Sequence, residues 1–191
     1  MKKSVVRCIF ILLLTFLNIV TYAQNSETNI TKSDSLIIVA MDPEKGFHHD
    51  YILFIPKGTP LKKKLYLLVE PNNTGKLSDS IEVHKKYAID LAAVSSVGNN
   101  ISTELNIPLL VPVFPRLESQ PLMYTHALDR DIVLEKSKQL KRLDLQLLEM
   151  IDDAGKVLAS MDIRVEPEIF MNGFSASGTF TNRFSFIHPG K

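Results

Sequence analysis

The chain has 191 residues, of which 45% are hydrophobic and 23% are charged, and its formal net charge is +1. This length is sufficient for one domain with a substantial apolar core. A charge so close to neutral argues against nucleic acid as a partner, because phosphate binding calls for an excess of basic residues. We therefore expect an ordinary globular protein with no nucleic-acid partner.

The first 23 residues have the pattern of a secretory signal peptide. Lys2, Lys3 and Arg7 precede an apolar run over 8–20, and small residues stand at positions 21 and 23. We predict cleavage after Ala23, which makes the protein secreted or periplasmic with no stable membrane anchor. The alternative is an uncleaved anchor, but the apolar run is shorter than the ~20 residues that a membrane-spanning helix needs.

Cleavage would also change the charge and the cysteine content. It would remove three of the 22 basic residues and none of the 21 acidic residues, so the formal net charge would become −2. Cys8, the single cysteine of the chain, would be lost with the signal peptide. We therefore predict no disulfide, no cysteine-bound metal and no cofactor, and a core that depends on apolar packing.

The first half of the remaining chain is predicted to contain three strands and a helix. The polar residues 24–34 are predicted to form a disordered lead-in. Strands at 36–41 and 51–55, separated by a turn with Pro43 and Gly46, are predicted to form an antiparallel hairpin at a sheet edge. The strand at 65–69 is apolar on both faces and is expected to be buried on both. A helix over 80–97 is predicted to end at Gly98-Asn99-Asn100.

The second half alternates between strands and helices. Its predicted elements are a proline-rich strand at 107–115, a loop at 116–126, a short helix at 127–133, an amphipathic helix at 135–160, a strand at 168–172 and a helix at 179–187. Such alternation after a hairpin implies an α/β fold with a mostly parallel sheet and helices on both faces. Ligands of such folds bind at the carboxyl ends of the strands.

A turn of small residues joins the last strand to the last helix. The segment Met171-Asn172-Gly173-Phe174-Ser175-Ala176-Ser177-Gly178 places Ser175 at its apex. A serine hydroxyl attacks a carbonyl only when a base takes its proton and donors stabilise the oxyanion. The main-chain N–H of Ala176, at the start of the helix, is suited to face that developing charge. The alternative is a plain turn of glycine and serine without a chemical role.

This segment resembles the nucleophile elbow of the α/β-hydrolase superfamily. The segments 124–131 and 183–189 also resemble secreted serine esterases related to polyhydroxybutyrate depolymerases and feruloyl esterases. In the pattern Gly-x-Ser-x-Gly the last glycine falls on Ser177, and Gly178 follows it. The resemblance covers Leu36 to Lys191. It implies an α/β-hydrolase-like domain over 35–191, a Ser175 nucleophile that forms an acyl intermediate, and a small-molecule or polymeric ester as substrate.

Other site residues follow from this resemblance less directly. A second oxyanion donor would come from Asn72 or Asn73, although the segment 71–75 lacks the usual His-Gly pair. His126 follows the fourth predicted strand on the side of the elbow and could line the pocket; the alternative is a loop histidine beside a helix-capping aspartate. His188 lies ~14 Å along the last helix from the turn, too far to act as the base.

In α/β-hydrolases the serine is activated by a histidine and an acidic residue, which together with it form a catalytic triad. Both follow the serine in the sequence, on loops after later strands. No such strand is predicted after Ser175, so the α/β-hydrolase-like domain is expected to be incomplete. The chain would then be either a part of a longer hydrolase or inactive as it stands. The apolar strand at 169–171 would form an open sheet edge, which favours the first and invites self-association. The competing hypothesis is a non-catalytic binding protein that pairs this edge with a partner.

Overall fold

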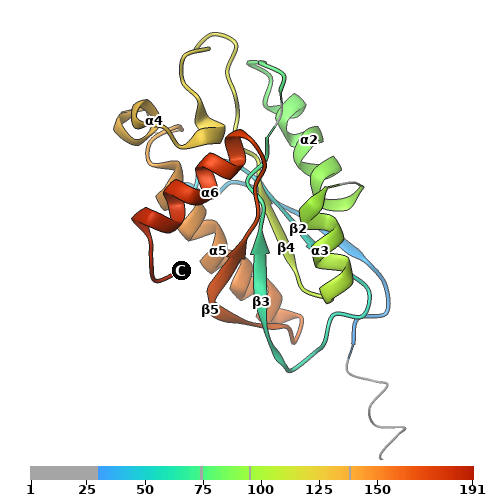
Figure 1. The fold of residues 1–191 in the computed structure, drawn as a ribbon. Helices are drawn as coiled ribbons and strands as arrows, with labels where there is room; N and C mark the ends of the chain where they lie inside the picture. The colour runs from blue at the N-terminus through green and yellow to red at the C-terminus, as the bar shows by residue number, and fades with distance from the viewer. Residues whose placement is uncertain (1–29, 74, 95, 138) are drawn as a thin grey trace, which may run out of the picture. The chain divides into compact units, whose positions relative to one another are not determined.

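The computed structural model describes residues 30–191 except 74, 95 and 138 (Figure 1). The predicted signal peptide and most of the predicted lead-in lie outside the described residues. Thr31 donates its main-chain N–H to the carbonyl of Thr59, at 3.0 Å. Asp34 accepts a hydrogen bond of 2.6 Å from the N–H of Lys57. The described end of the lead-in is therefore fastened to the turn at 56–59.

Within the residues that the structure describes, five strands form one mixed sheet. Their order is β1 (Ser35–Val39), β2 (Tyr51–Ile55), β4 (Leu109–Pro112), β3 (Lys64–Val69) and β5 (Arg164–Met171). Strand β2 runs antiparallel to both of its neighbours, whereas β4, β3 and β5 pair in parallel. Four of the five strands therefore point in the same direction. The predicted edge hairpin and the mostly parallel sheet are both confirmed.

Helices cover both faces of this sheet (Figure 1). One face carries α2 (Ile81–Ala93) and α3 (Val97–Leu105); the other carries the 3₁₀ turn η1 (Thr125–Ala127), α4 (Arg130–Leu134), α5 (Leu143–Ser160) and α6 (Ala176–Ile187). The side chains of alternate residues in β2 point to opposite faces of the sheet and pack under the helices on each face. Ile52 and Phe54 join the cluster under α2, whereas Leu53 and Ile55 join the larger cluster under α5 and α6.

The region predicted as one helix over 80–97 contains α2 and the start of a second helix, α3. The predicted helix end at Gly98 is wrong, because this glycine lies in the first turn of α3. Ser96 caps this helix by accepting a hydrogen bond of 2.8 Å from the N–H of Asn99. A Cβ at position 98 would overlap the carboxylate of Glu70, so the glycine serves close packing here.

Other boundaries also differ from the prediction. Helix α5 begins at Leu143 and not at 135, because Arg142 has a left-handed backbone with φ 50°. Strand β5 begins at Arg164 and includes Pro167, which the free side of an edge strand tolerates. The proline-rich strand shortens to Leu109–Pro112. Strand β5 pairs with β3 on one side, so within the described sheet its other side is an edge, as predicted.

Candidate active site

Ser175 stands at the tip of a strained turn between β5 and α6. Its backbone has φ 56° and ψ −117°, a conformation that a residue with a side chain rarely adopts. Such strain persists where the surrounding structure enforces it, and it is concentrated at functional sites. The side chain of Ser175 is exposed to solvent. The turn thus presents the hydroxyl at the carboxyl end of β5, which pairs in parallel with β3.

The neighbours of Ser175 hold this turn closed. A Cβ at Gly173 would overlap the main-chain carbonyl of Ser177, so a larger residue does not fit there. The Ser177 hydroxyl accepts a 2.9 Å hydrogen bond from the N–H of Phe174 and donates one of 3.0 Å to the Phe174 carbonyl. Serine in place of the glycine of the pattern therefore adds two bonds across the turn. The sequence pattern located Ser177 but did not reveal these bonds.

Ala176 is the first residue of α6 and is 5% exposed. The N–H groups at the first turn of a helix have no partner within the helix, and the helix dipole favours negative charge beside them. The first main-chain bond within α6 is donated by Thr179 to the carbonyl of Ser175, at 3.1 Å. The N–H of Ala176 is therefore available to a charge that develops near Ser175.

The structure brings Asn73, but not the side chain of Asn72, to the serine turn. The Asn73 amide donates a 2.7 Å hydrogen bond to the carbonyl of Phe174, the residue before Ser175. Asn72 is fully buried, and its side chain makes two hydrogen bonds to the main chain of Phe114. Its amide donates to the Phe114 carbonyl at 2.9 Å and accepts from the Phe114 N–H at 3.0 Å. Asn72 thus joins the ends of β3 and β4, whereas Asn73 joins the loop after β3 to the turn.

His126 lies beneath the surface in η1. It is 1% exposed, and its Nε2–H donates a 3.0 Å hydrogen bond to the Phe114 carbonyl that also binds Asn72. Burial lowers the pKa of His126 to about 4, because a charged imidazolium would lose its hydration there. A neutral imidazole sealed from solvent stabilises the loop after β4. This burial favours a structural role for His126 over the predicted contact with substrate.

Glu70 follows β3 directly, before the loop that carries Asn72 and Asn73. It is 5% exposed, and its carboxylate accepts hydrogen bonds from Ser96 Oγ at 2.9 Å and the N–H of Gly98 at 2.8 Å. Burial raises the pKa of Glu70, and the hydrogen bonds from Ser96 and Gly98 oppose that rise.

The hydroxyl of Ser175 has no hydrogen-bonded base within residues 30–73, 75–94, 96–137 and 139–191. His188 instead contacts the buried Asp144, with 2.9 Å between Nε2 and Oδ2, at the far end of α6. Burial raises the pKa of Asp144, but its hydrogen bonds to Arg142 and His188 outweigh this effect, so the pKa lies below its usual value. This cluster fastens α6 to α5, in accord with the prediction that His188 does not serve as the base.

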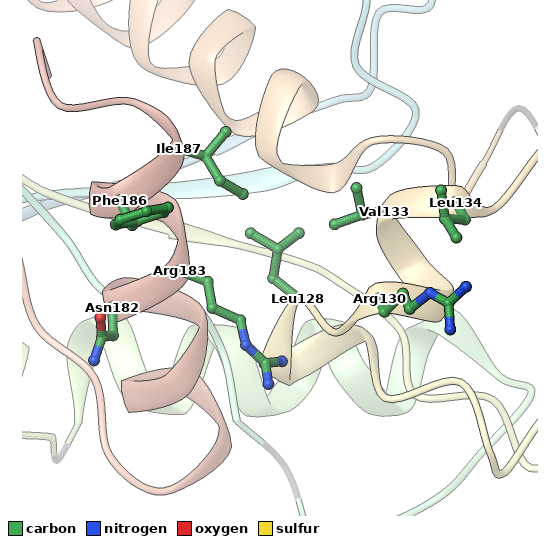
Figure 2. A pocket seen from close by; sticks show the side chains of 8 residues that line it. All are labelled: Leu128, Arg130, Val133, Leu134, Asn182, Arg183, Phe186 and Ile187. Carbon is green, nitrogen blue, oxygen red and sulfur yellow. The ribbon is translucent and has the colours of Figure 1, made fainter.

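An apolar cavity of about 610 Å³ lies along the second half of α6 (Figure 2). It is lined by Leu128, Arg130, Val133, Leu134, Asn182, Arg183, Phe186 and Ile187. Arg183 is anchored by a 2.9 Å hydrogen bond to the carbonyl of Ala127. Ser175 does not line this cavity, so the candidate nucleophile faces open solvent at the other end of the helix.

In the described part of the chain, the His, Cys, Asp and Glu side chains form no group of three that could hold a metal ion. None of its helices has the length and apolar character needed to span a bilayer.

The fold is similar to those of solved structures of two other proteins. No protein-family model and no curated protein sequence matches the chain. The structure is similar to that of poly(aspartic acid) hydrolase-1 from Sphingomonas sp. KT-1, with a TM-score of 0.50 and 14% identity over 84% of this chain. It is also similar to a thermostable esterase, with a TM-score of 0.47 and 19% identity over 82% of this chain.

The chain spans 53% of the first of these structures and 38% of the second. At such low identity the likeness concerns the fold alone. The protein therefore has an α/β-hydrolase-type fold.

Proposed function

We propose that this protein is a serine hydrolase of the esterase type that acts through an acyl-Ser175 intermediate. The observation that carries the proposal is the backbone of Ser175, with φ 56° and ψ −117° directly before α6. A fold of this type holds its nucleophile on such a strand-to-helix turn. Backbone strain at an exposed serine is expected where the hydroxyl has to be held in position to react with a substrate.

The reaction follows from the groups around this turn. Ser175 Oγ attacks the ester carbonyl carbon while its proton passes to a general base, an imidazole in enzymes of this kind. The carbonyl oxygen becomes an anion near the N–H of Ala176. The C–O bond to the alcohol then breaks, the alcohol takes the proton, and acyl-Ser175 remains. Water repeats the sequence on this intermediate and releases the acid.

One feature supports an ester with an apolar group as substrate. Phe174 is 79% exposed directly beside Ser175, so it offers an apolar ring to a bound ester next to the nucleophile. Asn73 fixes the carbonyl of the same residue, so the position of Phe174 is set by the loop after β3. The predicted second oxyanion donor would be an N–H group of this loop. The proposed substrate is a small or polymeric ester.

The test uses the full-length gene product and a fluorophosphonate probe, which phosphonylates an activated serine. We expect covalent labelling of Ser175, identified by peptide mass spectrometry, together with hydrolysis of p-nitrophenyl acetate. Ser175→Ala should abolish both, while Ser177→Ala should remain labelled at Ser175. A folded wild-type protein that takes up no label at Ser175 contradicts the proposal.

The second candidate is a non-catalytic binding protein. It is favoured by the Ser175 hydroxyl, which has no base beside it within the described residues, and by the edge of β5, where Phe170 is 45% exposed. Such a protein would pair this edge with a second chain, by adding a strand to the sheet. A folded, unlabelled protein that is dimeric in light scattering would favour this candidate.

Export from the cytoplasm is part of the proposal. It rests on the basic start and short apolar run of residues 1–23, which lie outside the described residues. The measurement is the N-terminal sequence of the protein recovered from the medium or the periplasm. We expect Gln24 as the first residue. Recovery of protein that retains Met1 in the membrane fraction would show an uncleaved anchor instead.

A further inference from the structure

The cavity along α6 has the composition of a site for a small molecule. Five of its eight lining residues are apolar, and the three polar ones are Asn182, Arg130 and Arg183. Every charged residue of the lining is therefore an arginine. The volume of about 610 Å³ falls within the range of about 300–1,000 Å³ that is usual for ligand pockets. Such pockets combine apolar walls with a few polar groups that orient the ligand.

Two of the apolar side chains in this cavity face solvent. Phe186, near the end of α6, is 87% exposed, and Leu134, at the end of α4, is 60% exposed. Figure 2 shows them on opposite sides of the cavity, with Leu128 between them. Leu128 is 1% exposed, so its side chain forms the floor. An apolar group that lies over Leu128 would take the two exposed side chains out of water, which is favourable.

The floor of the cavity has a strained backbone. Leu128 has φ 49° and ψ 50°, a left-handed conformation that is rare for a residue with a bulky side chain. Such strain persists where the surrounding structure enforces it, and ligand sites are among the places where it is concentrated. The N–H of Leu128 donates a 3.2 Å hydrogen bond to the carbonyl of Thr125, and Arg183 holds the carbonyl of Ala127 at 2.9 Å. The segment that carries the floor is therefore fixed in place.

The two arginines bring positive charge to the cavity. None of the ion pairs within the described residues includes Arg130 or Arg183. The neighbouring acid Asp129 caps α4 instead, by accepting a 3.0 Å hydrogen bond from the N–H of Ile132. The bond to Ala127 orients the guanidinium of Arg183, which has further N–H donors for an anion. A guanidinium and a carboxylate match well, because they form two parallel hydrogen bonds.

From these features we propose that the cavity binds a small carboxylic acid with an apolar body, of about the size of octanoic acid. The carboxylate binds to Arg183, and the apolar body lies over Leu128 between Phe186 and Leu134. Charge complementarity selects an acid over an alcohol or an amine of the same shape, because the lining contains arginines and no acidic residue. Ser175 is not part of this site, and the proposal does not depend on a reaction there.

The test measures the binding of octanoate to the full-length gene product by isothermal titration calorimetry. We expect octanoate to bind at least about tenfold more tightly than 1-octanol or octylammonium, which have the same body without the carboxylate. Hexanoate, which is two CH₂ groups shorter, should bind about fivefold more weakly than octanoate. A dissociation constant for octanoate above about 10 mM would overturn the proposal. Equal affinities for octanoate and 1-octanol would overturn it too.

Two substitutions separate the charged part of the site from the apolar part. Arg183→Gln should weaken the binding of octanoate about tenfold and leave that of 1-octanol unchanged, because only the acid loses charge-assisted hydrogen bonds. Phe186→Ala should weaken the binding of both compounds about fivefold, because it removes one apolar wall. Urea denaturation checks that each variant is folded. Arg183→Lys, which keeps the charge but not the paired donors, replaces Arg183→Gln if that variant does not fold, and it should also bind octanoate more weakly.

Each substitution has a matched control outside the cavity. Arg164 is an exposed arginine at the start of β5, and Phe174 is an exposed phenylalanine beside Ser175. Neither Arg164→Gln nor Phe174→Ala should change the affinity for octanoate. Equal effects of Arg164→Gln and Arg183→Gln would show attraction by net charge alone and would overturn the proposal. A loss of affinity in Phe174→Ala and not in Phe186→Ala would place the acid at the serine turn, which would also overturn it.

Discussion

Asn73 Nδ2 donates a 2.7 Å hydrogen bond to the carbonyl of Phe174, which joins the loop after β3 to the residue before the candidate nucleophile. This bond links two segments that are 101 residues apart in sequence. It brings the N–H groups of the loop to the same end of the sheet as the N–H of Ala176. A site for an oxyanion needs such a meeting of donors from two elements.

Replacement of Asn73 by alanine is predicted to affect the rate of labelling at Ser175, whereas replacement of Asn72 is predicted to affect the stability of the fold. Asn73→Ala should slow labelling of Ser175 by about fivefold, since one hydrogen bond contributes about 1 kcal/mol, with little effect on stability. Asn72→Ala leaves the buried N–H of Phe114 without an acceptor and should lower the free energy of unfolding by about 1–3 kcal/mol. Urea denaturation and labelling kinetics measure the two effects. The reverse assignment, a stability loss in Asn73→Ala alone, would contradict the arrangement described.

Gly173→Ala is predicted to open the serine turn. The new Cβ would overlap the main-chain carbonyl of Ser177, and a main-chain atom cannot move aside without distorting α6. We expect a loss of about 1–3 kcal/mol in the free energy of unfolding, as for other overpacked sites, and a loss of labelling at Ser175. Gly75→Ala is the control, because nothing lies within 4 Å of its Cβ position. Comparable losses in both variants would show that the turn is not the sensitive point.

Acid is predicted to destabilise the protein through two buried histidines. Burial lowers the pKa of both His49 and His126 from 6.5 to about 4. A folded-state pKa below the unfolded value means that the unfolded chain binds protons first as the pH falls. Their stabilisation is therefore complete above pH 6.5 and is lost as the pH falls toward 4, by at most about 3 kcal/mol for each histidine.

The measurement is the urea midpoint as a function of pH, together with nuclear magnetic resonance titration of the imidazole signals. The two buried rings should stay neutral down to about pH 4 in the folded protein. His126→Leu should flatten the pH dependence between 6.5 and 4, although it costs the bond to Phe114. A wild-type midpoint that is constant over this range would refute the prediction.

Self-association through β5 is a further proposal with a direct test. Phe170 stacks on Tyr66 with 4.3 Å between ring centroids, and both rings are close to half exposed at this edge of the sheet. Phe170→Asp should shift the protein toward the monomer in light scattering at high concentration, because a charge at an edge disfavours strand pairing. Leu36→Asp at the opposite edge strand, where Leu36 is 40% exposed, should leave the distribution unchanged. A wild-type protein that remains monomeric excludes the proposal.

The sequence predicted the features that depend on local pattern. The serine turn at 173–178, the edge hairpin and the alternation of strands and helices follow from small residues, turn residues and apolar spacing. These signals act between residues that are close in sequence, so they can be recognised without the fold. Boundaries were less accurate, because helix ends depend on capping contacts such as that of Ser96 with Asn99.

Only the tertiary structure decided how distant polar residues are used. Gly98 was predicted to end a helix, but it lies in the first turn of α3, where its N–H donates a hydrogen bond to the Glu70 carboxylate. Asn72 and Asn73 are identical in type and adjacent, yet one is buried against Phe114 and the other reaches Phe174. The sequence by itself determined the fold class and the candidate nucleophile. The partners of the polar side chains required the structure, because hydrogen bonds between segments far apart in sequence leave no periodic signal in the chain.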